Sequence, residues 1–175
     1  MKVIGLAGWS GAGKTTLLTR VIPHLLKGGL RVSVIKHAHH AFDVDVPGKD
    51  SWKHREAGAV EVLVSCTQRW ALMHELRGAA EPRLPELLAK MSRVDLVVVE
   101  GFKREPLRKI EIYRAANAKP FLFRDDSDVV GIATDTAVET TLPTAHLDDI
   151  EAIAAMMLRA AIPVEDVLAK SEAES

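Results

Sequence analysis

The feature that most constrains this chain is a glycine-rich segment at residues 8–15, which reads Gly-Trp-Ser-Gly-Ala-Gly-Lys-Thr. It matches the phosphate-binding P-loop pattern G-x-x-x-x-G-K-T. It also has the context that this pattern requires, because an apolar run at residues 1–7 precedes it and an amphipathic run at residues 15–27 follows. Glycines let such a loop approach a phosphate closely and point successive N–H groups at it. The sequence therefore predicts a strand, a nucleotide-binding loop and a helix in succession.

The residues of this segment have distinct predicted roles. Lys14 is a candidate catalytic residue, expected to place its positive charge at the β- and γ-phosphates. The hydroxyl of Thr15 is the expected Mg²⁺ ligand. The positive end of the new helix adds to the attraction for phosphate. The residues expected to surround the nucleotide here are Gly8, Ser10, Gly11, Ala12, Gly13, Lys14, Thr15 and Thr16.

The periodicity of apolar residues predicts the fold class. Residues 31–36 read as a second strand, and a strand-helix-strand unit of this length predicts parallel strands with a right-handed crossover. Two short strands at 60–65 and 69–74 read as a hairpin, which would make the sheet mixed. Further helices are predicted at 50–59, 81–91 and 147–161, and further strands at 110–113, 121–123 and 129–133. We therefore predict a three-layer α/β P-loop NTPase fold with a mostly parallel, mixed β-sheet.

Length and composition limit the remaining classes. The 175 residues predict one domain over residues 1–162, followed by a short amphipathic tail over residues 163–175. A formal net charge of −1 argues against a general nucleic-acid binder. The single cysteine, Cys66, excludes an internal disulfide and favours a reducing compartment. No apolar stretch approaches the roughly 20 residues that span a membrane. We expect a cytoplasmic protein without a signal peptide.

A second nucleotide-site element is predicted around residue 100. Four consecutive aliphatic residues at 96–99 indicate a strand buried on both faces, and Glu100 follows at its carboxyl end. This is the Walker B arrangement, in which an acidic residue reaches Mg²⁺ directly or through water. Because the glutamate side chain is longer than that of aspartate, it favours binding the metal through water, or orienting a water molecule, over direct ligation. Glu100 is therefore a candidate both as a metal ligand and as a catalytic residue. Gly101 is expected to let the backbone approach the γ-phosphate.

The loop at residues 37–51 is rich in histidine and aspartate. In a doubly wound fold it leaves the sheet at the edge that carries the P-loop. Carboxylates beside a nucleotide suit Mg²⁺, so Asp43 is a candidate metal ligand and Asp45 a candidate catalytic residue. Either could act as a switch that senses the metal and the γ-phosphate. A polar surface loop and a transition-metal site are the alternatives.

Several stretches together resemble one known family, the molybdopterin-guanine dinucleotide biosynthesis protein B (MobB) family, over residues 1 to about 135. Beyond the loop at residues 8–17, they read Lys-His-Ala-His-His at 36–40, Phe-Asp-Val-Asp at 42–45, Pro-Gly-Lys-Asp-Ser at 47–51, Arg-Glu-Ala-Gly-Ala at 55–59 and Val-Glu-Gly-Phe-Lys at 99–103. The resemblance implies a GTP-binding, Mg²⁺-using homodimer that is at most a slow GTPase. It also implies an adaptor for the molybdopterin guanylyltransferase enzyme, which joins GMP to molybdopterin.

Base recognition and two other functions are left open by the residues themselves. Guanine is often read by an aspartate, and the candidates here are Asp125, Asp126, Asp128 and Asp135, because the stretch at residues 117–120 lacks the usual Asn-Lys-x-Asp pattern. A small-molecule kinase is one alternative function, with phosphate-clamping arginines at Arg104, Arg108 and Arg114. A metallochaperone GTPase is the other, based on His37, His39 and His40.

Overall fold

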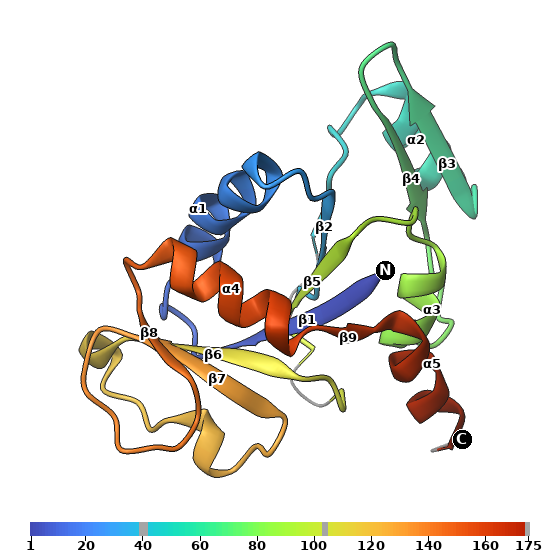
Figure 1. Cartoon of the computed structure of the whole chain (residues 1–175). Coiled ribbons are helices and arrows are strands. Elements are labelled where there is room, and N and C mark those ends of the chain that lie inside the picture. Colours follow the sequence, from blue (N-terminus) through green and yellow to red (C-terminus); the bar gives the residue numbers. More distant parts are fainter. Residues whose placement is uncertain (39–41, 103–104, 174–175) are drawn as a thin grey trace. The chain divides into compact units, whose positions relative to one another are not determined.

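The P-loop follows the central strand of a parallel sheet (Figure 1). The computed structural model describes residues 1–38, 42–102 and 105–173. They form two compact units, one made of Met1–His37 with Leu84–Ser175 and the other of Ala38–Arg83. In the larger unit the strand order is β2-β5-β1-β6-β7-β8, and every neighbouring pair on this path is parallel. These strands are β1 (Lys2–Ala7), β2 (Val32–Lys36), β5 (Leu96–Glu100), β6 (Lys109–Tyr113), β7 (Val129–Thr134) and β8 (Thr144–His146).

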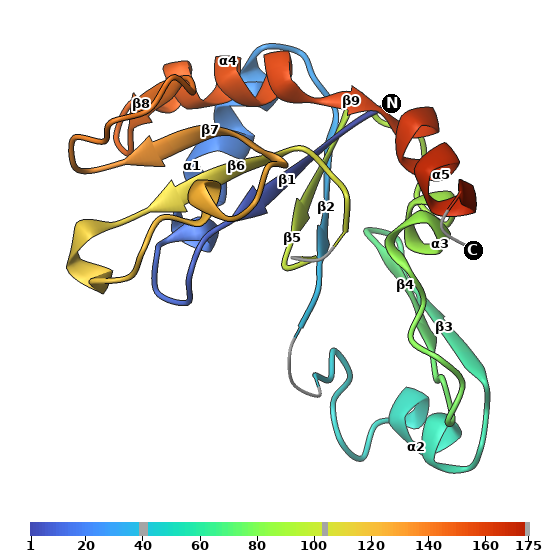
Figure 2. The same cartoon turned by 90° about the horizontal axis from the view of Figure 1, so that it is seen from below.

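Two helical layers cover the sheet. Alternate side chains of each strand point to opposite faces, so Ile4 and Val98 join one apolar cluster while Val3 and Val97 join the other. The first cluster packs against α1 (Lys14–Lys27) and α4 (Ile150–Ala160), which contact each other; α4 runs along the top of Figure 2. The second packs against α3 (Leu84–Ala89) and α5 (Val164–Ala173). The predicted three-layer α/β class is therefore confirmed.

The helices differ in detail from the sequence prediction. α1 continues through Pro23. The helix predicted at 81–91 occupies only Leu84–Ala89, because Pro85 suits a first turn and not the middle of a longer helix. In α5, within the predicted amphipathic tail, Val164 and Val167 are buried while the acidic residues between them are exposed. Among the described residues, no helix is long and apolar enough to cross a membrane.

The smaller unit contains α2 (Asp50–Glu56) and an antiparallel hairpin of β3 (Glu61–Ser65) and β4 (Trp70–His74). The expectation that this hairpin makes the main sheet mixed is wrong, because β3 and β4 form a separate two-stranded sheet. The antiparallel strand of the main sheet is instead β9 (Ile162–Pro163), which pairs with the first residues of β1. Most side chains of the hairpin are exposed. This is typical of an antiparallel strand pair that is not covered by helices on both faces.

The strand predicted at 121–123 is also wrong, because a 3₁₀ turn, η2 (Leu122–Arg124), occupies this place. The cause is the fully buried carboxylate of Glu111 on β6. It accepts hydrogen bonds from the backbone N–H groups of Leu122 at 2.7 Å and Phe123 at 2.9 Å. Because these two N–H groups bind Glu111, they cannot pair with a neighbouring strand. The Glu111 side chain therefore holds η2 as a turn beside β6.

Replacing Glu111 with alanine is expected to reduce the free energy of unfolding by about 2–4 kcal/mol, because two partly buried N–H groups would lose their acceptors. Urea unfolding measures the change. Glu139→Ala, at an exposed position, is the matched control. A Glu111→Ala variant as stable as the control would contradict this role.

The same carboxyl predicts a pH dependence. Burial raises the pKa of Glu111, and the negative charge of Asp126 adds to this, although the two backbone N–H donors act in the opposite direction. A raised pKa in the folded state means that the group favours folding below the usual glutamate pKa and loses that contribution as pH rises through the folded value. The stability of wild type relative to Glu111→Gln should therefore decrease between pH 4 and pH 8. An increase would contradict the assignment.

Candidate functional site

The P-loop connects the end of β1 to the start of α1 and depends on two of its glycines for shape. Gly8 has φ +145°, and a Cβ placed there would lie 2.5 Å from the carbonyl oxygen of Ile112 on β6. Gly13 has φ +91° and is the last residue before α1, where free N–H groups of the first turn attract anions. The backbone of the loop therefore depends on residues without a Cβ, as the P-loop pattern predicts.

Lys14 lies across this loop. Its Nζ donates hydrogen bonds to the carbonyl oxygens of Gly8 at 2.7 Å and Trp9 at 3.1 Å. Both acceptors belong to the first two residues of the loop, so the ammonium group is held on the loop itself. A cation in this place adds a point charge to the N–H groups that would surround a phosphate.

The structure brings two of the three predicted metal ligands, Thr15 and Glu100, together. The hydroxyl of Thr15 donates to Oε1 of Glu100 at 3.4 Å, and Glu100 is only 8% exposed at the end of β5. Parallel pairing of β1 with β5 places Leu6 opposite Glu100, which puts the carboxylate at the edge where the P-loop begins. Nζ of Lys36 lies 3.9 Å from the same carboxylate oxygen. Two adjacent oxygen donors, one of them charged, suit a hard cation such as Mg²⁺.

Gly101 has a packing role beside its predicted role at the γ-phosphate. Its φ is +102°, and a Cβ there would come within 2.8 Å of the carbonyl oxygen of His37. The N–H of His37 donates to the carbonyl oxygen of Glu100 at 2.8 Å. The chain after β2 is therefore in direct backbone contact with the acidic strand end.

A group of residues after β6 and β7 also lies against the P-loop. The guanidinium group of Arg114 lies 3.5 Å from the point where a Cβ on Gly13 would be. The side-chain amide of Asn117, in η1 (Ala115–Asn117), donates to the carbonyl oxygen of Ser10 at 3.2 Å. The carboxylate of Asp135 accepts from the N–H of Ala115 at 2.8 Å. The sequence indicates Arg114 only as a phosphate-clamping residue of the kinase alternative, and it indicates no role for Asn117. Their position after a strand neighbouring β1 is the sign that could have identified them.

Asp43 and Asp45 lie in the smaller unit, where both bind Arg55. The guanidinium of Arg55 donates to Asp43 at 2.8 and 3.0 Å, to Asp45 at 3.2 Å and to Glu75 at 2.8 Å. The backbone N–H of Asp45, and then Arg55, lower the pKa of Asp43, so it stays ionised. Ser51 also donates to Asp45 at 2.8 Å. These contacts give both carboxylates a structural role, and their roles in metal binding and catalysis remain predictions.

The predicted histidine site is only partly visible. His39 and His40 lie outside the described residues, as does Arg104 of the kinase alternative. In the part of the chain that the structure describes, no group of three or more histidine, cysteine, aspartate or glutamate side chains could hold a metal ion.

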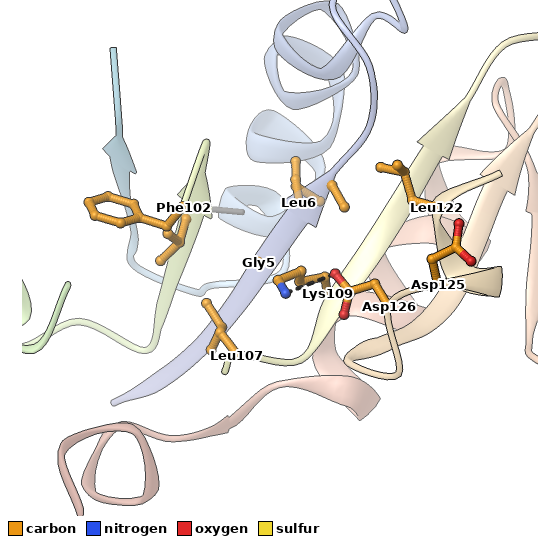
Figure 3. Close-up of a pocket in the computed structure, with 10 residues that line it drawn as sticks. Gly5, Leu6, Phe102, Leu107, Lys109, Leu122, Asp125 and Asp126 are labelled. Carbon is orange, nitrogen blue, oxygen red and sulfur yellow. Dashed lines mark hydrogen bonds and ion pairs between the residues drawn. The ribbon is translucent and has the colours of Figure 1, made fainter. Parts of the chain in front are cut away.

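A separate pocket of about 130 Å³ opens in the larger unit, beside β1 and β6 (Figure 3). Its lining is mostly apolar and includes Phe102, Leu107 and Leu122. Asp125 and Asp126, two of the candidate base-reading residues, also line it, and Asp126 binds the buried ammonium of Lys109 at 3.0 Å. Asp135 is the candidate that instead belongs to the group beside the P-loop.

Comparisons with known proteins identify related sequences and a related structure. A family model described as molybdopterin guanine dinucleotide synthesis protein B matches residues 3–135. A molybdopterin-guanine dinucleotide biosynthesis adapter protein of Escherichia coli K12 is 42% identical over 155 residues, which are 87% of this chain and 89% of the relative. The protein of the same description from Haemophilus influenzae is 44% identical over 140 residues, 78% of this chain and 76% of its own. A crystal structure of molybdopterin-guanine biosynthesis protein B superposes with a TM-score of 0.72 at 27% identity, covering 90% of this chain and 98% of the other.

Proposed function

Because the chain belongs to the molybdopterin guanine dinucleotide synthesis protein B family, we propose that it is a GTP-binding adapter in molybdenum cofactor biosynthesis. Relatives at 42% and 44% identity are named molybdopterin-guanine dinucleotide biosynthesis adapter proteins. In this role it assists the molybdopterin guanylyltransferase enzyme in attaching GMP to molybdopterin. It hydrolyses GTP slowly, with Mg²⁺.

The observation that carries the nucleotide part of this proposal is the contact between Thr15 and Glu100 at the start of α1, 3.4 Å apart. The hydroxyl and the carboxylate would hold Mg²⁺, while Lys14 and the loop N–H groups would bind the phosphates. When bound, Mg²⁺ supplies positive charge that offsets the charge of the β- and γ-phosphates. Glu100 would also orient the water molecule that attacks the γ-phosphate.

Equilibrium binding of GTP and of ATP, each with Mg²⁺, tests the proposal, with turnover followed in the same samples. We expect a clear preference for GTP and turnover below about one per second, slower than most enzymes. Preference for ATP, or fast turnover when small-molecule acceptors are added, would favour a kinase instead. Co-purification with the guanylyltransferase enzyme tests the adapter role.

We also propose that two copies of the chain associate through one face of the hairpin, defined here by Leu63, Trp70 and Leu72. Leu63 lies opposite Leu72, and Trp70 is two residues before Leu72 on β4, so the three side chains share one face. They are 61%, 67% and 47% exposed. β3 and β4 are also both edge strands of their sheet, and exposed apolar edges favour pairing with another chain.

Light scattering on a sizing column tests this association. The wild type is expected at the mass of a dimer, and Trp70→Asp at the mass of a monomer, because a buried charge would oppose the contact. Leu26→Asp, at a position on α1 that is 52% exposed, is the control and should remain dimeric. A dimeric Trp70→Asp variant would contradict the proposed surface.

A cytoplasmic location is proposed as well, because the thiol of Cys66 is exposed and unpaired, as thiols in reducing compartments are. Cell fractionation tests it, and recovery of the protein in the membrane or periplasmic fraction would contradict it.

A further inference from the structure

We propose that Arg114 is a second phosphate-binding cation of the nucleotide site, held beside the P-loop by the segment that follows β6. The inference rests on the proposed nucleotide binding and adds a residue that no P-loop motif contains. Arg114 follows directly after β6, the strand that pairs with β1 on the side opposite β5. Lys14 and Arg114 therefore reach the loop from different elements.

The position of the guanidinium group is the first argument. A Cβ built on Gly13 would lie 3.5 Å from Nη2 of Arg114 and 3.8 Å from Nε. Gly13 precedes the first turn of α1, where the N–H groups of the helix start are directed at an anion. The guanidinium group of Arg114 therefore lies beside Gly13, in the direction that a side chain there would take, next to the helix start that would hold the phosphate.

Arg114 also has N–H donors that are available to a ligand. Its nearest carboxylate, on Asp135, is 3.8 Å from Nη1, which is longer than a hydrogen bond, and the arginine side chain is 43% exposed. A guanidinium group has five N–H donors in a planar fork that matches phosphate oxygens. Asp135 therefore attracts Arg114 to this side of the loop without using up its donors.

The segment that follows Arg114, residues 115–120, is hydrogen-bonded to the P-loop and to the end of β7 at several points. Asp135 accepts from the N–H of Ala115, and Asn117 donates to Ser10. The indole N–H of Trp9 donates to the carbonyl oxygen of Pro120 at 2.8 Å. These bonds tie residues 115–120 to the P-loop and to the end of β7. The guanidinium group is therefore held near its proposed target before a ligand arrives, which lowers the entropy cost of binding.

Binding of GTP, GDP and guanosine to matched variants tests the proposal. We expect Arg114→Ala to weaken GTP and GDP binding about tenfold, because charge-assisted hydrogen bonds to phosphate are lost. Guanosine has no phosphate, so its affinity should not change. Arg114→Lys should recover part of the loss, since it keeps the charge without the planar fork. Arg159→Ala, which removes an exposed arginine of α4, is the control for the loss of charge.

Thermal unfolding of each variant identifies any folding defect, and Arg114→Lys remains informative if Arg114→Ala is unstable. Unchanged GTP affinity in a folded Arg114→Ala variant, or an equal loss for guanosine, would overturn the inference. A wild type that prefers ATP would instead overturn the proposed GTP binding, and ATP, ADP and adenosine would then test Arg114 in the same way.

Discussion

Replacing Lys14 with alanine is expected to weaken the binding of GTP with Mg²⁺ by about tenfold or more, which corresponds to about 1.4 kcal/mol. Nζ of Lys14 lies within 3.1 Å of two carbonyl oxygens of the P-loop, so the charge is held where the phosphates would bind. Alanine removes this charge and leaves the backbone N–H groups of the loop in place. Titration calorimetry or displacement of a fluorescent nucleotide measures the change.

Lys27→Ala is the matched control, because it makes the same substitution in the exposed last turn of the same helix. Its affinity should equal that of the wild type. Thermal unfolding of both variants separates loss of binding from loss of structure. If Lys14→Ala binds GTP as tightly as Lys27→Ala, the P-loop assignment is wrong.

The substitution Glu100→Gln should spare nucleotide binding and lower the turnover of GTP by about tenfold or more, since groups that act on the attacking water contribute at least this much. Glutamine keeps the size of the side chain and can still accept from Thr15, but it loses the charge that would attract Mg²⁺. The dependence of turnover on the Mg²⁺ concentration should weaken as well. Single-turnover hydrolysis over a range of Mg²⁺ concentrations measures both effects.

Glu151→Gln, on the exposed first turn of α4, is the control for this change. Wild-type turnover and Mg²⁺ dependence in Glu100→Gln would remove Glu100 from the metal site. The two experiments are complementary, because Lys14 is expected to act mainly on affinity and Glu100 mainly on the chemical step.

The sheet of the larger unit was predictable where a local pattern decides the structure. β1 and β5 are short aliphatic runs buried on both faces, and α1 carries an apolar stripe. Such patterns depend only on neighbouring residues. Which sheet a hairpin joins depends on contacts between residues far apart in the sequence. The prediction that β3 and β4 join the main sheet is therefore wrong, because they form a sheet of their own. The turn at η2 was missed for the same reason, because it depends on the buried carboxylate of Glu111.

In the candidate site, too, the residues of a local motif were predictable and the residues brought in by long-range contacts were not. Residues 8–16 are contiguous, so a motif was enough to find them. Arg114 and Asp135 come near the loop only because β6 and β7 lie on one side of β1 in the sheet. No short motif encodes that order. The strands themselves were predicted, and their order in the sheet was the missing information.

The strand order also has a consequence for the order of folding. β2 does not pair with β1, because β5 lies between them and pairs with both. β5 begins at Leu96, after the whole of the smaller unit, Ala38–Arg83, has been synthesised. A nascent chain therefore contains the complete P-loop motif long before the sheet that supports it can close. Long-range pairing of this kind slows folding and leaves apolar strands exposed meanwhile, so ribosome-bound chains that stop before residue 96 should bind chaperones and not nucleotide.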